Sequence, residues 1–220
     1  MKTKHYMLVF TLGVVFTTAR AQQFTLKGGL NVSSNLIEFA DMPPELDMKS
    51  SPVYGFHGGA SFDYLFTDRF SLESGLVYMQ KGGTHDITFN FFGLTSKVTQ
   101  DFNFHYVDIP LQAKYRFGNG DVRFFLGLGP YIGIGLWGKV KSTSEFMGNS
   151  ESETKNLSFG TDFELLELGL CGGAGVEYNS FLLGLNYSYG LNNLDRSASD
   201  NDIFKNRVFS VSLGYIINKR

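Results

Sequence analysis

The sequence predicts an all-β protein, an eight-stranded antiparallel up-and-down transmembrane β-barrel with short periplasmic turns and long extracellular loops. Three observations lead to this prediction: apolar and polar residues alternate along eight segments, aromatic residues flank the short turns, and glycines share one face of several segments. The composition agrees, because 26 glycines, 22 phenylalanines and 11 tyrosines in 220 residues favour strands and tight turns over helices. No apolar run reaches the roughly 20 residues that a membrane-spanning helix needs.

The first 21 residues have the layout of a secretory signal peptide. Lys2 and Lys4 precede an apolar stretch at residues 6–16, and Ala19-Arg20-Ala21 provides the small residues of a cleavage site. We therefore expect residues 1–21 to be a signal peptide and residues 22–220 to form a single barrel domain. The net charge of -2 and the pI near 6.1 give no electrostatic basis for binding nucleic acid.

Alternation with a period of two residues, the pattern of strands with two different faces, runs through eight segments. In the clearest, residues 122–137, every second residue from Val122 to Leu136 is apolar, and four glycines, at positions 127, 129, 133 and 135, stand between them. The other seven segments lie at about residues 24–33, 53–66, 70–81, 101–117, 163–178, 181–192 and 207–217. Each segment therefore has an apolar face and a face rich in glycine and polar residues.

The connections between these segments alternate in length. Three are tight turns, at residues 67–69, 118–121 and 179–180, and they consist mostly of the residue types that form turns. The other four, roughly residues 34–52, 82–100, 138–162 and 193–206, are long and polar. Short turns at one end and long loops at the other are typical of outer-membrane barrels.

A two-sheet sandwich would show the same alternation with its apolar face turned inward, but two features favour the membrane barrel. Glycines at positions 127, 129, 133 and 135 share the face opposite the aliphatic residues, where they would make room inside a narrow eight-stranded barrel. Aromatic residues of the apolar register flank the short turns, as in the girdle at a membrane interface. These residues are Tyr64, Phe66, Phe70, Tyr115, Phe117, Phe124, Tyr178 and Phe181.

Two features of the predicted strands point to local irregularity. Pro110 and Pro130 lie within strands, where proline cannot donate a ladder hydrogen bond. The apolar register also changes near Tyr106, because the aromatic residues before it are even-numbered and the apolar residues after it are odd-numbered. We therefore expect a β-bulge near Tyr106–Val107.

Seven charged residues share the face that we assign to the barrel interior. We expect these carboxylates and cations to pair into a network that fills the barrel, with a proton path or narrow conductance as the less favoured role. The residues are Glu73, Asp108, Lys114, Arg116, Arg123, Glu167 and Glu177.

No motif points to catalysis or to a cofactor. The sequence has no Walker A or Gly-x-Ser-x-Gly motif, and the Gly-x-Gly at residues 127–129 lacks the glycine at the sixth position of a dinucleotide site. His57, expected in the interior, and His85, expected in a loop, have no spacing that would gather them with His105 on a metal. The single cysteine, Cys171, excludes an internal disulfide. The sequence therefore predicts no enzyme, no cofactor and no metal site.

Several segments match a known family in order. The segment His105-Tyr106-Val107-Asp108-Ile109-Pro110-Leu111-Gln112-Ala113-Lys114-Tyr115 resembles the Tyr-x-(Glu/Asp)-Ile-Pro-Leu-x-x-Lys-Tyr strand of the PorT-like outer-membrane β-barrel family of Bacteroidetes-type bacteria. Shorter matches lie at residues 27–31, 127–131, 173–178, 187–191 and 212–215. The resemblance implies a barrel in the bacterial outer membrane, and a few members of the family resemble components of protein secretion or gliding machinery. The chain departs from many outer-membrane barrels because it ends on residues 216–220 rather than on a terminal aromatic residue.

We therefore expect a non-enzymatic protein of the bacterial outer membrane with a side-chain-filled lumen. Its partners would be the membrane lipid and a protein or surface component bound at the extracellular loops. Three alternatives stay open at this point: a narrow porin-like channel, a component of a secretion or gliding machinery, and a secreted soluble barrel that carries a lipid inside.

Overall fold

The computed structural model describes residues 22–38, 46–91, 94–146, 149–196 and 202–217, which form ten strands of one antiparallel sheet. The predicted signal peptide, residues 1–21, lies outside the described residues. Among the described residues, no helix is long and apolar enough to cross a membrane.

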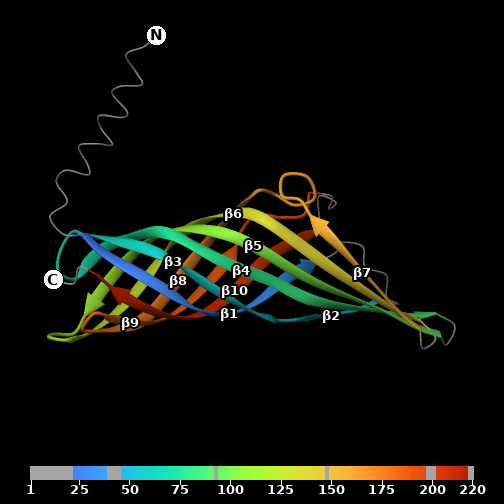
Figure 1. The fold of residues 1–220 in the computed structure, drawn as a ribbon, viewed down its shortest axis with the longest axis horizontal. Helices are drawn as coiled ribbons and strands as arrows, with labels where there is room; N and C mark the ends of the chain where they lie inside the picture. The colour runs from blue at the N-terminus through green and yellow to red at the C-terminus, as the bar shows by residue number, and fades with distance from the viewer. Residues whose placement is uncertain (1–21, 39–45, 92–93, 147–148, 197–201, 218–220) are drawn as a thin grey trace, which may run out of the picture.

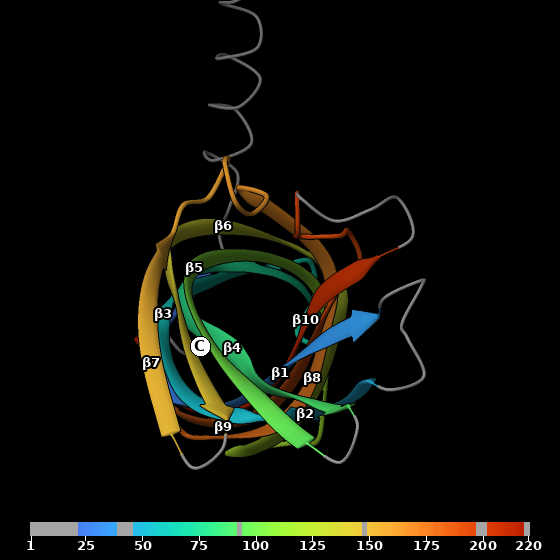
Figure 2. The same ribbon diagram turned by 90° about the vertical axis from the view of Figure 1, so that its right-hand side faces the viewer.

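Eight of the strands close into a ring, which Figure 2 shows along the axis of the barrel. β10 pairs with β1 over its whole length, and this pairing closes the wall. The strands of the ring, in order, are β1 (Gln22–Glu38), β3 (Val53–Leu65), β4 (Phe70–Phe91), β5 (Leu94–Phe117), β6 (Val122–Phe146), β8 (Leu166–Tyr178), β9 (Phe181–Gly190) and β10 (Ile203–Ile216). The prediction of an all-β, antiparallel, up-and-down barrel is confirmed.

The three short turns lie at one end of the barrel, the left end in Figure 1, which we call the turn end. The described chain also starts and finishes there, since the backbone N–H of Ile217 donates to the carbonyl of Phe24 at 2.8 Å. In the turn between β5 and β6, Gly118 and Gly120 have φ angles of 103° and 73°, in the left-handed region that favours glycine. The sequence of this turn therefore suits its backbone.

The opposite end carries a β-ribbon in place of two of the predicted long loops. β4 and β5 stay paired out to Phe91 and Leu94, and β6 continues to Phe146 and pairs there with β7 (Asn149–Leu157). The short strand β2 (Leu46–Ser51) pairs with β4. Residues 82–100 and 138–162, expected as irregular polar loops, are thus largely strand, and we call β2, β7 and residues 82–91, 94–103 and 138–146 the ribbon.

The apolar register faces outward around the ring. Ile132 and Leu136 are each 43% exposed on β6, and no second sheet covers them among the described residues. Glu167, in the opposite register of β8, is 0% exposed and lies inside the barrel. This orientation excludes the sandwich, in which the two faces would be exchanged.

The expected bulge is present, but the extra residue lies on β6 and not on β5, so the change of register inferred for β5 was wrong. The pairing of β5 with β6 shifts between His105 and Tyr106, and the unpaired residue is Leu136 on β6. β5 does not change its facing, because Phe104 and Tyr106 are both buried in the interior. The register changes on β6 instead, where Leu136 and Trp137 are both exposed. The aromatic residues of β5 are even-numbered because the interior itself becomes aromatic toward the ribbon.

Candidate functional site

The interior of the barrel is the candidate site, because it gathers charged residues that are buried. β5 supplies a row of even-numbered residues to it, and Asp108, Lys114 and Arg116 are all buried. Glycines of β6 and β8 clear the space that these long side chains occupy. A Cβ at position 169 would lie 2.3 Å from the ring of Tyr131 and 2.5 Å from the carbonyl oxygen of Tyr189.

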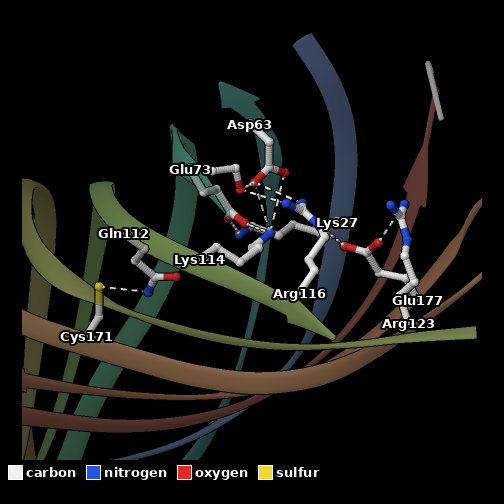
Figure 3. A network of polar contacts seen from close by, with 10 residues as sticks. Lys27, Asp63, Glu73, Gln112, Lys114, Arg116, Arg123, Cys171 and Glu177 are labelled. Carbon is white, nitrogen blue, oxygen red and sulfur yellow. Dashed lines mark hydrogen bonds and ion pairs between the residues drawn. The ribbon is translucent and has the colours of Figure 1, made fainter. Parts of the chain in front are cut away.

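Nearest the turn end, seven side chains form a continuous set of ion pairs, which we call the turn-side ion layer (Figure 3). Glu73 pairs with Lys114 and, at 2.6 Å, with Lys27. Asp63 is shared between Lys114, at 3.3 Å, and Arg116, at 3.1 Å. The layer comprises Lys27, Asp63, Glu73, Lys114, Arg116, Arg123 and Glu177.

Glu177 connects the two arginines of this layer. Its Oε1 is 2.9 Å from Nε of Arg116, and its Oε2 is 3.2 Å from Nη2 of Arg123. Arg116 also donates from Nη1 to Oγ of Ser71 at 2.6 Å. The guanidinium of Arg116 therefore has a partner on three other strands, which fixes its position across the barrel.

A second, smaller set lies farther from the turns, and we call it the central ion layer. Nζ of Lys81 lies 2.9 Å from Asp108 and 3.0 Å from Glu167. Tyr131 donates its hydroxyl to Oε1 of Glu167 at 2.7 Å, and the amide of Asn206 donates to Oε2 at 3.0 Å. Two carboxylates therefore share one ammonium group, and the neutral donors of Tyr131 and Asn206 complete the hydrogen bonds of Glu167.

Between the two layers is a polar cavity of about 50 Å³. His57 lines it, and its ring is held by Oδ1 of Asn31, 2.6 Å from Nδ1, and by Oγ of Ser212, 2.8 Å from Nε2. Nε2 of Gln112 donates to the thiol sulfur of Cys171 at 3.0 Å. A volume of this size holds a few water molecules and no larger solute.

At the ribbon end the interior changes from charged to aromatic. Phe104 packs against Phe163 with ring centroids 5.1 Å apart, and Phe163 against Phe204 at the same distance. Phe159 packs on Tyr106 at 5.1 Å. Phe159 and Phe163 belong to the connection between β7 and β8, which folds back over the barrel. We call these rings, with Phe102, the aromatic cap.

The seven charged residues expected in the interior all point there in the structure, in the two ion layers. His57 also lies inside, whereas His85, expected in a loop, is buried on β4 beside Ser50 and the ring of Phe102. The eight aromatic residues named for the interface lie on the outer wall around the turn end, with Tyr64 half-buried and the other seven exposed.

Sequence reasoning did not include three members of the ion layers, Lys27, Asp63 and Lys81. Each belongs to the same register as the residues that were named, so the alternation contained the signal. Lys81 was missed because the strand was expected to end there, and β4 in fact continues to Phe91. No three His, Cys, Asp or Glu residues of the described chain are grouped to hold a metal ion.

Comparison with known proteins gives one family match and several similar solved structures. The family model described as outer membrane protein beta-barrel domain matches residues 17–196. Ail, the attachment invasion locus protein of Yersinia pestis, is 19% identical, with 89% of this chain and 98% of that chain covered and a TM-score of 0.40. OprG of Pseudomonas aeruginosa is 16% identical, with 90% and 97% covered and a TM-score of 0.45.

A search of curated proteins gave no match. The family model, however, spans most of the barrel, from before β1 to the connection after β9. The chain therefore belongs to the family of the outer membrane protein beta-barrel domain, and its location is the bacterial outer membrane.

Proposed function

We propose that this protein is a non-enzymatic outer-membrane barrel with a closed interior, which acts through the ribbon that it displays outside the cell. The observation that carries the proposal is the succession of the turn-side ion layer, the central ion layer and the aromatic cap. These three occupy successive parts of the interior and leave a cavity of about 50 Å³ between the ion layers, a hollow of about 170 Å³ beside Lys81 and Phe102, and one of about 110 Å³ beside Phe163 and Phe204. Eight strands enclose a space that side chains can fill completely.

The interior charges favour a structural role over a catalytic one. Asp108 and Glu167 both bind the ammonium group of Lys81, and Glu177 binds two arginines. A general acid or a nucleophile needs access to a substrate and a partner base. The carboxylates of the two layers are instead engaged by cations and enclosed, so the interior also leaves no room for a carried lipid.

The ribbon is the surface best suited to a partner. In β7 every residue is exposed except Leu157, and among the described strands β7 pairs with β6 alone. Its second edge therefore presents backbone donors and acceptors that a strand of another protein could pair with. The expected partner is a protein or a component of a cell surface.

Within the larger family, we place the chain nearest to the PorT-like group of Bacteroidetes-type bacteria. The segment from His105 to Tyr115 on β5 supports this placement. It contributes Asp108 and Lys114, one to each ion layer. A role in protein secretion or gliding follows only for some members of that group, and deleting the gene and assaying export would test it. Residues 1–21 are the proposed signal peptide that directs export of this chain.

Conductance of the purified protein tests the closed interior. In a planar lipid bilayer we expect no steady current above the bare membrane at 1 M salt, about the highest ionic strength in common use. A steady, sizeable conductance would show that the layers leave a path and would favour the narrow channel. The partner surface is tested separately by pull-down with the full chain and with a variant that lacks residues 143–152, the tip of the β6–β7 hairpin.

A further inference from the structure

Three side chains in mutual contact lie on the outer wall of the barrel, where its apolar surface ends toward the ribbon. Trp137 on β6 stacks on His105 of β5, with centroids 4.7 Å apart and planes at 23°. The hydroxyl of Tyr78 on β4 lies 2.5 Å from Nδ1 of His105. Trp137 is 49% exposed, and amphipathic aromatic rings prefer the level of lipid headgroups. The trio therefore marks the outer boundary of the hydrocarbon on this side of the barrel.

Immediately beyond the trio, the same outward face becomes basic. Lys139 and Lys141 follow Trp137 on β6 at alternate positions, so both point outward. Both side chains are exposed to solvent. Neither forms an ion pair or a side-chain hydrogen bond with any described residue. Asp101 stands opposite Lys141 in the ladder, but its carboxylate accepts the hydroxyl of Thr84 at 2.5 Å.

Uncharged polar groups complete this surface on β4 and β5. Asn103 pairs with Lys139 in the ladder, and its Oδ1 accepts a hydrogen bond from Nε2 of Gln80 at 3.1 Å. Beside these two amides is a hollow of about 170 Å³, which Tyr54 and Asp101 also line on its outer side and which reaches inward to Ser33, Lys81 and Phe102. Tyr54 is 84% exposed, and the β3–β4 ladder ends near it, at the pair of His57 and Met79.

We propose that this surface binds the phosphorylated sugar headgroup of a glycolipid in the outer leaflet. We call it the wall patch and define it as Tyr78, Asn103, His105, Trp137, Lys139 and Lys141. The two lysines bind the phosphate, and the amides and the hollow beside them receive sugar hydroxyl groups. The aromatic trio contacts the junction between the headgroup and the acyl chains.

Charge complementarity and position single out this occupant. Lysines at the headgroup level that pair with no side chain of the described residues attract anionic lipid, at about 1 kcal/mol for each charge near the surface. A phosphate alone would use only the lysines, whereas the hollow offers amide, phenol and carboxylate groups that suit neutral hydroxyl groups. A lipid that carries both phosphate and sugar uses the whole surface. The proposal is independent of whether the interior conducts.

The test is thermal unfolding of the full chain in detergent, with purified diphosphorylated lipid A as the probe. A ligand that binds the folded state raises the unfolding temperature, and its dependence on concentration gives the affinity. We expect the double variant K139Q/K141Q to bind lipid A about 30-fold more weakly than the unchanged protein, from the loss of two charges. The matched control is K97Q/K155Q, which removes two other lysines of the ribbon and should bind as the unchanged protein does.

Two further probes decide the chemistry. Lipid A without its phosphates should raise the unfolding temperature less than diphosphorylated lipid A does, and phosphatidylglycerol, which has phosphate without the sugars, should also bind more weakly. Equal affinity of K139Q/K141Q and the control for lipid A would overturn the site. Equal affinity of the unchanged protein for phosphatidylglycerol and lipid A would overturn the glycolipid as its occupant.

Discussion

Glu177 shows at the scale of one residue how the interior is held together. Both of its oxygens are engaged, one by Arg116 and one by Arg123, and the carboxylate is buried. A buried charge that loses its partner keeps the cost of its desolvation without compensation. The stability of the turn-side ion layer should therefore depend on complete pairing more than on any single contact.

Replacing Glu177 with glutamine should lower the free energy of unfolding by about 3 kcal/mol, because two guanidinium groups lose their shared carboxylate. Urea-induced unfolding of the protein in lipid vesicles measures this change. E164Q is the control, since Glu164 and Arg196 form an exposed pair at 3.6 Å that is worth less than about 1 kcal/mol. Equal effects of the two changes would contradict the importance assigned to the buried layer.

Gly169 illustrates the opposite requirement, for empty space. A valine there would press on the ring of Tyr131, whose hydroxyl binds Glu167, and on the backbone of β9. We expect G169V to destabilise the barrel by about 1–3 kcal/mol, the usual effect of overpacking. The change G172A should cost less, because a Cβ there meets the flexible end of Leu128 at 3.1 Å. The same urea titration compares them.

The facing of single residues could be predicted well, because the period of a strand places alternate side chains on opposite faces. Glu167 and Glu177 were assigned to the interior on that ground alone. Their partners could not be predicted, since pairing across the barrel depends on the stagger of strands that are distant in sequence. The contact of Lys81 with Glu167, for example, joins residues 86 positions apart.

At the scale of the element, β6 carries the feature that shapes the wall. The extra residue Leu136 lets both Leu136 and Trp137 face outward and returns Gly138 to the interior. Without the bulge, a regular strand would send Trp137 inward and the following lysines with it. The bulge therefore places Trp137 of the aromatic trio and the two lysines of the wall patch on the outer face of the barrel wall.

Trp137 is the single tryptophan of the chain, so its fluorescence tests this orientation directly. In vesicles of brominated phospholipid, we expect stronger quenching by bromine near the headgroup than by bromine near the end of the acyl chain. Deleting Leu136 should remove the bulge and leave the indole facing outward, because Trp137 then directly follows the inward-facing Gly135, so the quenching should be retained. Strong quenching from the middle of the bilayer would place the outer boundary elsewhere.

The ends of the elements were harder to predict than their existence. Residues 82–100 were assigned to a loop because both faces are polar beyond Lys81, so alternation no longer marks a strand. Outside the membrane neither face needs to be apolar, and backbone pairing continues without that signal. The bulge was expected at the right level because the interior changes chemically there, although the extra residue is on the neighbouring strand.

At the scale of the whole molecule, two groups of side chains close the interior of the barrel. Uncharged rings of the aromatic cap close the ribbon end, whereas the charged side chains of the ion layers close the remainder, and the two meet where Nζ of Lys81 lies 4.6 Å from the ring centroid of Tyr106. Each should therefore block ions without the other.

Opening one closure should consequently leave the barrel sealed. We expect F159A/F163A to show no steady conductance in a planar bilayer, whereas adding K114A and R116A to it should give a measurable one. Circular dichroism of each variant verifies that the strands are formed. Current through F159A/F163A alone would show that the ion layers are permeable.

The length of the central strands determines which part of the protein an approaching antibody or bacteriophage contacts first. β5 has 24 residues, whereas about 9–11 suffice to cross the hydrocarbon. The remaining residues, at roughly 3.3 Å each, extend the strand into the ribbon beyond the bilayer, at the right of Figure 1. Antibodies or bacteriophage fibres that approach the bacterium should contact the far end of the ribbon before they reach the lipid. Sequence variation under immune or phage pressure should therefore concentrate in the ribbon.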